Sequence, residues 1–253
     1  MIVQEIDDHQ DPLGTKVFTL ISDRKYLQVG DHALPIVTAL PSWLNQLFLF
    51  CTKKRCPLLS WLFDYRNLMF FYPMLMRRLS RKIKKYAPKQ IIISSFAIAK
   101  NITPLSGVPM KLYLHSPMQY IWSHYDEYDK KLHGIKGFLF HYIVPKLRKW
   151  DKKFTKFDVI TANSQYTADL AKELYHMKAK VQYPKLLNLY YETPVADQPL
   201  AYYVYVGRLV AFVKECDLII KLFNKIKKPL IMIGSGPDEE YLKSIAGDTI
   251  IFL

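Results

Sequence analysis

Glycine and cysteine are both scarce in this sequence. The 253 residues include only 9 glycines, about half the number expected from an average usage of ~7%. The 3 cysteines, Cys51, Cys56 and Cys216, are too few and too scattered for a disulfide framework, and no Cys-x-x-Cys pair is present. These shortages exclude a disulfide-rich secreted domain and a structural zinc site of the usual spacing, so we expect a reducing, cytoplasmic compartment.

The chain also lacks a cationic leader and an unbroken hydrophobic span. Residues 1–11 carry four acids where a signal peptide needs bases. The longest uncharged run, residues 32–52, is long enough to cross a bilayer, but Pro35 and Pro41 make it a poor helix. We therefore expect a soluble protein, with peripheral contact to the inner face of the cell membrane as the one membrane role to consider.

Positive charge is abundant and concentrated. The formal net charge is +14, and residues 53–85 hold ten bases and one acid among many large apolar side chains. Bases beside bulky apolar groups are typical of an interfacial amphipathic helix, so an anionic membrane surface is a predicted partner of residues 53–85. A buried helix with a solvated basic face accounts for the same pattern equally well. Nucleic acid is not predicted as a partner, because no RNA- or DNA-binding signature accompanies the bases.

Short apolar strands alternate with helices along the chain, and half of the residues are apolar, which is enough for a large core. The predicted strands are 16–21, 90–94, 111–114, 157–162, 180–183, 202–206, 230–233 and 249–253. The predicted helices are 68–86 with a kink or break at Pro73, 136–153 restarted at Pro145, 165–175 capped by Ser164, 215–226 and 239–245. This order predicts an α/β fold of two Rossmann-like domains, with parallel sheets covered by helices on both faces. The predicted domains are 1–185, without its first strand, and 201–253, which is incomplete; residues 186–200 form the linker.

One motif places a base at the end of a predicted strand. Arg208 follows Gly207 after strand 202–206, at the carboxyl end of a parallel sheet, where ligands bind in doubly wound folds. Its planar guanidinium suits a diphosphate, and Lys214 adds a second positive charge. An exposed arginine without a ligand is the competing interpretation.

A glycine turn follows the next predicted strand, 230–233. Gly234 and Gly236 allow a close backbone approach to a ligand, and the helix after Pro237 favours anions at its amino end. The third glycine of a dinucleotide fingerprint is missing, so an NAD site is not favoured. A tight turn without a ligand is equally compatible with these residues.

The remaining motif is the segment LHSPMQYIW at 114–122. His115 stands just past predicted strand 111–114, beside a proline and several aromatic residues. This position favours a role in an active cleft over the alternative of a purely structural histidine. The 7 histidines form no ligand-spaced cluster, so no metal site is predicted.

Together these motifs resemble glycosyltransferase family 4, the retaining nucleotide-sugar enzymes with the two-domain GT-B fold. The mannosyltransferase-like branch of bacterial surface polysaccharide synthesis is the most similar. The resemblance extends with gaps from residue 16 to 253 and includes Ser94-Ser95, Ala99-Lys100, Ala162-Asn163-Ser164 and Tyr183-Pro184. Two departures are clear: Gln119 replaces an arginine, and Lys214 lies one residue further from Arg208 than in the family.

The resemblance implies a function and a set of roles. The enzyme would transfer a hexose from a nucleotide-sugar donor, with GDP-mannose favoured, to a lipid-linked or surface glycan, and it would need no metal. Residues 1–185 would serve the acceptor and residues 201–253 the donor. His115 would face the transferred sugar, while Arg208 and Lys214 would neutralise the donor pyrophosphate. The predicted nucleotide contacts are Gly234, Gly236 and Pro237; the predicted sugar or acceptor contacts are Ser116, Met118, Tyr120 and Trp122.

Parts of the family pattern are missing from this sequence. The Glu-x7-Glu motif of the second domain and the glycine-rich turn of the first are absent, and both breaks fall at family glycine positions. We therefore expect a fragment that is truncated at both ends. Each end would fall at a codon that was interpreted as a stop but that the source translates as glycine. By itself, the fragment should be inactive. The alternative function is a non-catalytic, basic membrane- or nucleic-acid-binding protein on a degenerate Rossmann scaffold.

Overall fold

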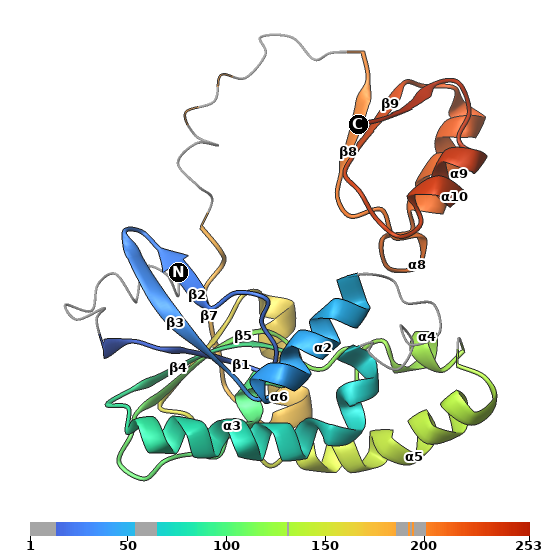
Figure 1. Cartoon of the computed structure of the whole chain (residues 1–253). Coiled ribbons are helices and arrows are strands. Elements are labelled where there is room, and N and C mark those ends of the chain that lie inside the picture. Colours follow the sequence, from blue (N-terminus) through green and yellow to red (C-terminus); the bar gives the residue numbers. More distant parts are fainter. Residues whose placement is uncertain (1–13, 54–64, 131, 186–191, 193, 195–200) are drawn as a thin grey trace. The chain divides into compact units, whose positions relative to one another are not determined.

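The protein is described by a computed structural model that covers residues 14–53, 65–130, 132–185, 192, 194 and 201–253 (Figure 1). The chain divides into two compact units, Met1–Leu186 and Leu187–Leu253. This division lies at the start of the linker predicted for 186–200, most of which falls outside the described residues. Each unit is an α/β unit with a parallel sheet.

The first unit is built on a four-stranded parallel sheet in the order β4-β5-β6-β7. Its strands are β4 (Ile91–Phe96), β5 (Met110–Ser116), β6 (Val159–Ala162) and β7 (Lys180–Val181). A second sheet in the order β1-β3-β2 joins a parallel pair to an antiparallel hairpin. Its strands are β1 (Val17–Thr19), β2 (Tyr26–Val29) and β3 (His32–Thr38).

The helices of the first unit follow or separate these strands (Figure 1). They are α2 (Ser42–Lys53), the 3-10 helix η2 (Tyr65–Phe71), α3 (Tyr72–Tyr86), η3 (Ala99–Asn101), α4 (Tyr125–Asp129), α5 (Gly134–Asp151) and α6 (Gln165–Tyr175). The predicted cap of α6 is confirmed, since the Ser164 side chain accepts a hydrogen bond from the Thr167 amide. No helix among the described residues is long and apolar enough to cross a membrane.

Three sequence-based expectations for this unit concern prolines. The helix predicted for 68–86, with a kink or break at Pro73, does divide, after Phe71; Pro73 lies in the first turn of α3, where its missing N–H costs no hydrogen bond. The uncharged run 32–52 is not one helix, as expected, but becomes β3 and α2, separated at Pro41. The restart predicted at Pro145 is wrong, because α5 continues through it.

The second unit is a smaller sheet with the order β10-β9-β8, all parallel. Its strands are β8 (Tyr203–Val206), β9 (Leu230–Ile233) and β10 (Ile250–Phe252). Its helices are α8 (Ala211–Lys214), α9 (Cys216–Ile226) and α10 (Glu239–Ile245), of which α8 was not predicted. Leu209, Ile220, Met232 and Leu242 have no exposed surface and form the centre of its core.

A buried polar cluster holds the first unit together. The Lys100 ammonium lies 2.8 Å from Asp151 Oδ1, and both side chains are fully buried. Asn101 Nδ2 donates to Asp151 Oδ1, while Trp122 Nε1 and the Tyr175 hydroxyl donate to Oδ2 at 2.9 and 2.6 Å. Burial lowers the pKa of Lys100, although the Asp151 carboxylate opposes that shift. One carboxylate therefore ties η3, the segment after β5, the end of α5 and the end of α6 to one another.

Replacing Asp151 by alanine should leave the buried Lys100 and Tyr175 side chains, and the partly buried Trp122 indole, without the carboxylate that they share. Removing one partner of a buried ion pair costs about 3–5 kcal/mol, and we expect the free energy of unfolding to fall by that amount. Asp126→Ala, at an exposed acid of α4, is the control and should change it by less than about 0.5 kcal/mol. Urea unfolding followed by circular dichroism measures both variants, and equal midpoints for the two would contradict the role given to Asp151.

Candidate functional site

His115 lies inside β5, one residue before its end, rather than just past the strand as expected. Leu112 and Leu114 point into the core, so alternation along the strand turns His115 to the opposite face of the sheet. Its ring Nε2 lies 2.8 Å from the Ser94 hydroxyl on the neighbouring strand β4. The Tyr113 ring packs edge-on against the imidazole, with centroids 4.8 Å apart. Two adjacent parallel strands therefore bring a hydroxyl and an imidazole together at their carboxyl ends.

The surroundings of His115 favour a neutral imidazole. Partial burial lowers the pKa of His115 below its ordinary value. The His115 carbonyl accepts a hydrogen bond from the Thr167 hydroxyl, which lies in the first turn of α6. A neutral ring offers one donor and one acceptor nitrogen, so this edge can hydrogen-bond a hydroxyl or a phosphate oxygen.

The segment after β5 mostly packs inward. Met118 has no exposed surface and belongs to the core, so the sugar contact expected for it has no accessible side chain to make it. Trp122 directs its indole N–H to Asp151. The Ser116 hydroxyl donates to the Pro117 carbonyl, and the Tyr120 ring packs against Tyr128. His115 differs from these residues, because its ring nitrogen meets the Ser94 hydroxyl at the carboxyl ends of β4 and β5.

In the second unit, the predicted glycine turn lies against the segment that carries Arg208. The Gly207 amide donates to the Ile233 carbonyl, and the Leu209 amide donates to the Ser235 carbonyl, both at 3.0 Å. A Cβ on Gly234 would lie 2.0 Å from the Gly207 carbonyl oxygen. A Cβ on Gly236 would lie 1.9 Å from the Leu209 carbonyl oxygen. Close backbone packing thus accounts for both glycines without any ligand.

This packed turn presents bases at the carboxyl ends of β8 and β9. Arg208 is exposed, and its guanidinium has no ion-pair or hydrogen-bond partner among the described residues. The Asp238 carboxylate accepts a hydrogen bond from the Ala211 amide, which fixes the start of α8 beside the turn. Lys214 ends α8 and is exposed. Pro237 is also exposed in the turn. The sequence did not predict this contact of Asp238, because the partner residue, Ala211, lies 27 residues away in the chain.

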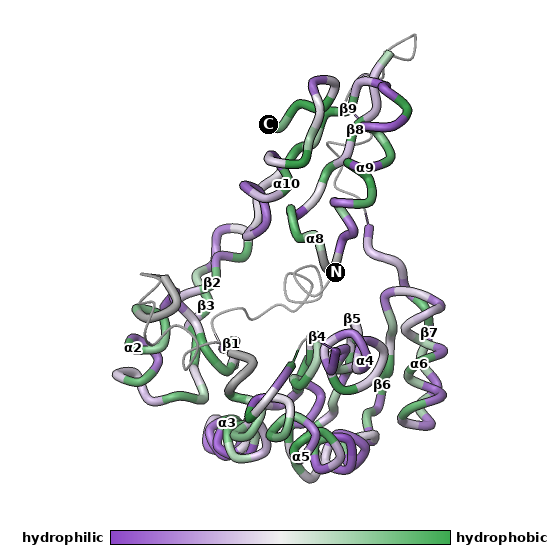
Figure 2. Tube along the Cα trace, turned by 90° about the vertical axis from the view of Figure 1, so that its right-hand side faces the viewer, coloured by the Kyte–Doolittle hydropathy of each residue, from purple (hydrophilic) through white to green (hydrophobic). Residues whose placement is uncertain are grey.

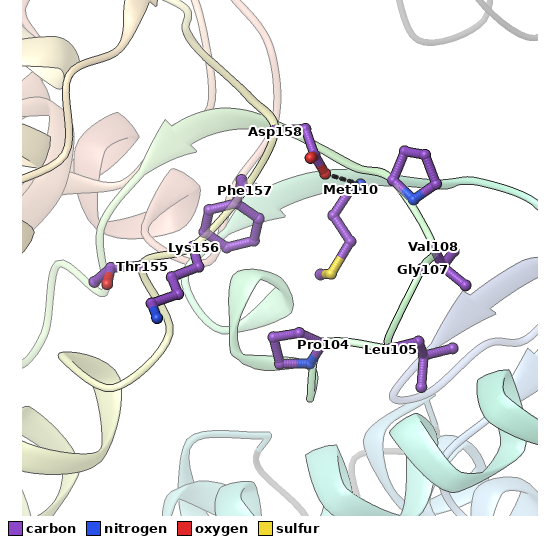
Figure 3. A pocket seen from close by; sticks show the side chains of 10 residues that line it. Pro104, Leu105, Gly107, Val108, Met110, Thr155, Lys156, Phe157 and Asp158 are labelled. Carbon is purple, nitrogen blue, oxygen red and sulfur yellow. Dashed lines mark hydrogen bonds between the residues drawn. The ribbon is translucent and has the colours of Figure 1, made fainter.

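A hollow of about 620 Å³ lies at the other edge of the first unit's sheet (Figure 3). It is lined by the loop 104–110 and by residues 155–158, which precede β5 and β6. The Asp158 carboxylate accepts a hydrogen bond from the Met110 amide across its wall. Since these are the amino ends of the strands, the hollow is separate from the His115 edge.

The basic stretch 53–85 is described in part, because residues 54–64, with Trp61, lie outside the described residues. Within α3, Leu75, Met76 and Leu79 are buried in the core of the unit. An insertion of this apolar face into lipid, as the interfacial-helix interpretation requires, would remove it from that core. The alternative, a buried helix with a solvated basic face, describes α3. Lys82 is held inward, since its ammonium donates to the Thr38 carbonyl at 2.5 Å.

Comparison with known proteins leaves the family unassigned. A scan against protein-family models and a search of curated proteins found no match to this chain. Within the part of the chain that the structure describes, no three His, Cys, Asp or Glu side chains gather as a metal site would require.

Gly234→Ala should destabilise the second unit. Gly234 has a φ of 141°, and its Cβ would collide with the Gly207 carbonyl. Backbone strain and overpacking together cost about 2–4 kcal/mol. Ser235→Ala, at the exposed neighbouring residue, is the control and should leave the unfolding transition in place. Differential scanning calorimetry of both variants tests this, and unchanged melting of Gly234→Ala would refute the close packing of the two segments.

The lowered pKa of His115 predicts a pH effect on stability. The unfolded chain binds the proton at the ordinary pKa of about 6.5, whereas folded His115 resists it. The free energy of unfolding should therefore fall as the pH drops from about 6.5 toward the lower folded pKa. Measured by urea unfolding across this pH range, the free energy of unfolding should fall less steeply for His115→Gln than for the wild type. Identical pH profiles for the two proteins would show that His115 is not in the described environment.

Proposed function

We propose that this chain carries the donor-binding and sugar-facing edges of a retaining glycosyltransferase of family 4, with a GT-B architecture. The observation that carries the proposal is Arg208, an exposed guanidinium at the carboxyl end of β8, on a segment held rigidly against the Gly234–Gly236 turn. Ligands of parallel α/β sheets bind at this edge. The proposed reaction transfers a hexose, with GDP-mannose as the favoured donor, to a lipid-linked or surface glycan.

Arg208 is proposed to bind the donor diphosphate. Its fork of N–H donors can hold two phosphate oxygens at once, and the backbone behind it is fixed by two hydrogen bonds of 3.0 Å. Lys214, at the end of α8, supplies a second positive charge to the same group. These preorganised charges stabilise the pyrophosphate most strongly as it leaves the sugar and gains negative charge. They would therefore stabilise the transition state more than the bound donor, which accelerates transfer.

His115 is proposed to contact the transferred sugar. A neutral imidazole can donate to a sugar hydroxyl or accept from one, and the Ser94 hydroxyl fixes the orientation of the ring through Nε2. In retaining transfer of the type implied by the resemblance, the departing phosphate acts as the base. His115 would therefore position the sugar and stabilise charge, and no protein nucleophile is needed.

The alternative function, a non-catalytic basic binding protein, is favoured by a different observation. The outer side of α3 carries exposed bases and no acid. That surface would bind a polyanion or a membrane whether or not the chain binds a sugar donor. Donor binding therefore separates the two functions: the glycosyltransferase proposal requires it and the alternative does not.

Donor binding can be measured by titration calorimetry of the purified chain with GDP-mannose, UDP-glucose and ADP-glucose. Arg208→Ala should weaken binding of the preferred donor by about 10- to 100-fold, since a charge-assisted hydrogen bond contributes about 1.5–3 kcal/mol. Lys228→Ala is the matched control, because it removes a base at the amino end of β9 and should leave the affinity unchanged. If no nucleotide-sugar binds, or if both variants weaken binding equally, the proposed role of Arg208 is wrong.

A further inference from the structure

The carboxyl end of β4 carries an exposed aromatic ring. Alternate residues of this strand, from Ile91 to Ser95, are buried, so Ser94 and Phe96 are turned to the other face of the sheet. The Phe96 side chain is 65% exposed. Strands β4 and β5 lie side by side in both views (Figures 1 and 2). Phe96 therefore lies two residues beyond Ser94, on the face of the sheet that also carries His115.

A shift in strand register aims His115 at this edge. The residues on either side of His115 pair with Ser95 and Phe96, so His115 itself is an extra residue without a partner on β4. An extra residue of this kind bends its strand and re-aims its side chain, and it is common next to active sites. The imidazole consequently meets the Ser94 hydroxyl, at 2.8 Å, on the face to which Phe96 is turned.

The backbone directly after Phe96 is strained. Ala97 has a φ of 77°, in the left-handed region that residues other than glycine rarely adopt. Every other non-glycine residue with a positive φ in the described part of the chain ends a helix, where this conformation is routine: Ala87, His176, Glu215 and Lys227. Ala97 instead follows a strand, and the next residue, Ile98, is back in the core. Strain of this kind is typical of functional sites, and here it leaves Phe96 on the outside.

The chemistry of this edge selects an uncharged ligand. Neither β4 nor the segment 115–122 contains a lysine, arginine, aspartate or glutamate, whereas a phosphate group would need a base. The phenyl ring of Phe96 can cover an apolar face, while the Ser94 hydroxyl and the His115 imidazole can each donate and accept hydrogen bonds. A pyranose fits this set, because its C–H groups form an apolar face and its hydroxyls form a polar rim.

We propose that Phe96 is the platform on which a pyranose ring of the acceptor glycan stacks, with Ser94 as a hydrogen-bonding partner of its hydroxyls. The assignment to the acceptor rests on the proposed function, in which His115 contacts the transferred sugar. That sugar must lie against the acceptor hydroxyl that receives it. Ser94 contacts His115, and Phe96 lies about 7 Å further along the strand, which is close to the span of one pyranose. Phe96 would therefore select acceptors by the shape of their terminal sugar.

The platform can be tested by NMR titration of the whole chain, isotope-labelled at its phenylalanine rings, with the methyl glycosides of mannose, glucose and galactose. The Phe96 ring signals should move as the preferred glycoside is added. Phe96→Ala should weaken its binding by about 10-fold, because one apolar face of the sugar is then left in water. Phe96→Trp keeps a flat apolar ring at this position and should retain the binding.

Two controls make the test specific. Phe138→Ala removes a phenyl ring of α5 that is 71% exposed, and it should leave the affinity for the glycoside unchanged. Addition of GDP-mannose distinguishes the acceptor from the transferred sugar, since the glycoside should stay bound at Phe96 when the donor is present. Circular dichroism verifies that each variant is folded.

Several results would overturn the proposal. Phe96 ring signals that do not respond to any of the three glycosides would do so directly, as would equal affinities of Phe96→Ala and the wild type. Displacement of the glycoside by GDP-mannose would assign the platform to the transferred sugar instead, and a response of Phe96 to GMP alone would assign it to a nucleotide base. Nucleotide-sugar binding at Arg208 without glycoside binding contradicts only the acceptor platform. Glycoside binding at Phe96 without nucleotide-sugar binding contradicts only the transferase, so the two proposals fail separately.

Discussion

The buried carboxylate of Asp151 is the constraint on which the first unit depends. It receives hydrogen bonds from Asn101, Trp122 and Tyr175 and forms an ion pair with Lys100, and of these partners all but the partly exposed Trp122 are buried. An ion pair in this setting stabilises only when every partner is present, because each charge alone would be strongly destabilising. The cluster anchors the chain where it leaves the carboxyl ends of β4 and β5. The edge that carries Ser94 and His115 is therefore held by contacts on the opposite side of the sheet.

Local signals in the sequence predicted a large part of the fold. Strand β9, helix α10 and the Ser164 cap were each predicted at the correct residues, since apolar runs, turn residues and capping hydroxyls are local features. The β2–β3 hairpin was missed, although the two residues between its strands, Gly30 and Asp31, are a local turn signal; α2 and α8 were missed as well. The Lys100–Asp151 pair could not be predicted from local features, because its members are 51 residues apart and carry no pattern that joins them.

The candidate site shows a similar division between local and distant information. The sequence identified His115, Arg208 and the glycine turn through their positions at strand ends. It could not identify Ser94 as the partner of His115, because that contact depends on the β4–β5 register, which shifts between Ser95 and Phe96. Nor could it show that Met118 belongs to the core. A segment of aromatic and other apolar residues looks the same in sequence whether it lines a cleft or fills an interior.

The proposed function rests on a donor diphosphate at the carboxyl ends of β8 and β9. Chemical-shift mapping of the isotope-labelled chain with its preferred nucleotide-sugar tests this claim most directly. We expect the amide signals of residues 207–210 and 234–238 to move as the donor is added, with the Arg208 side-chain signal among the largest changes. Shifts confined to the hollow at 104–110 and 155–158, or no shift at any donor concentration, would contradict the proposal.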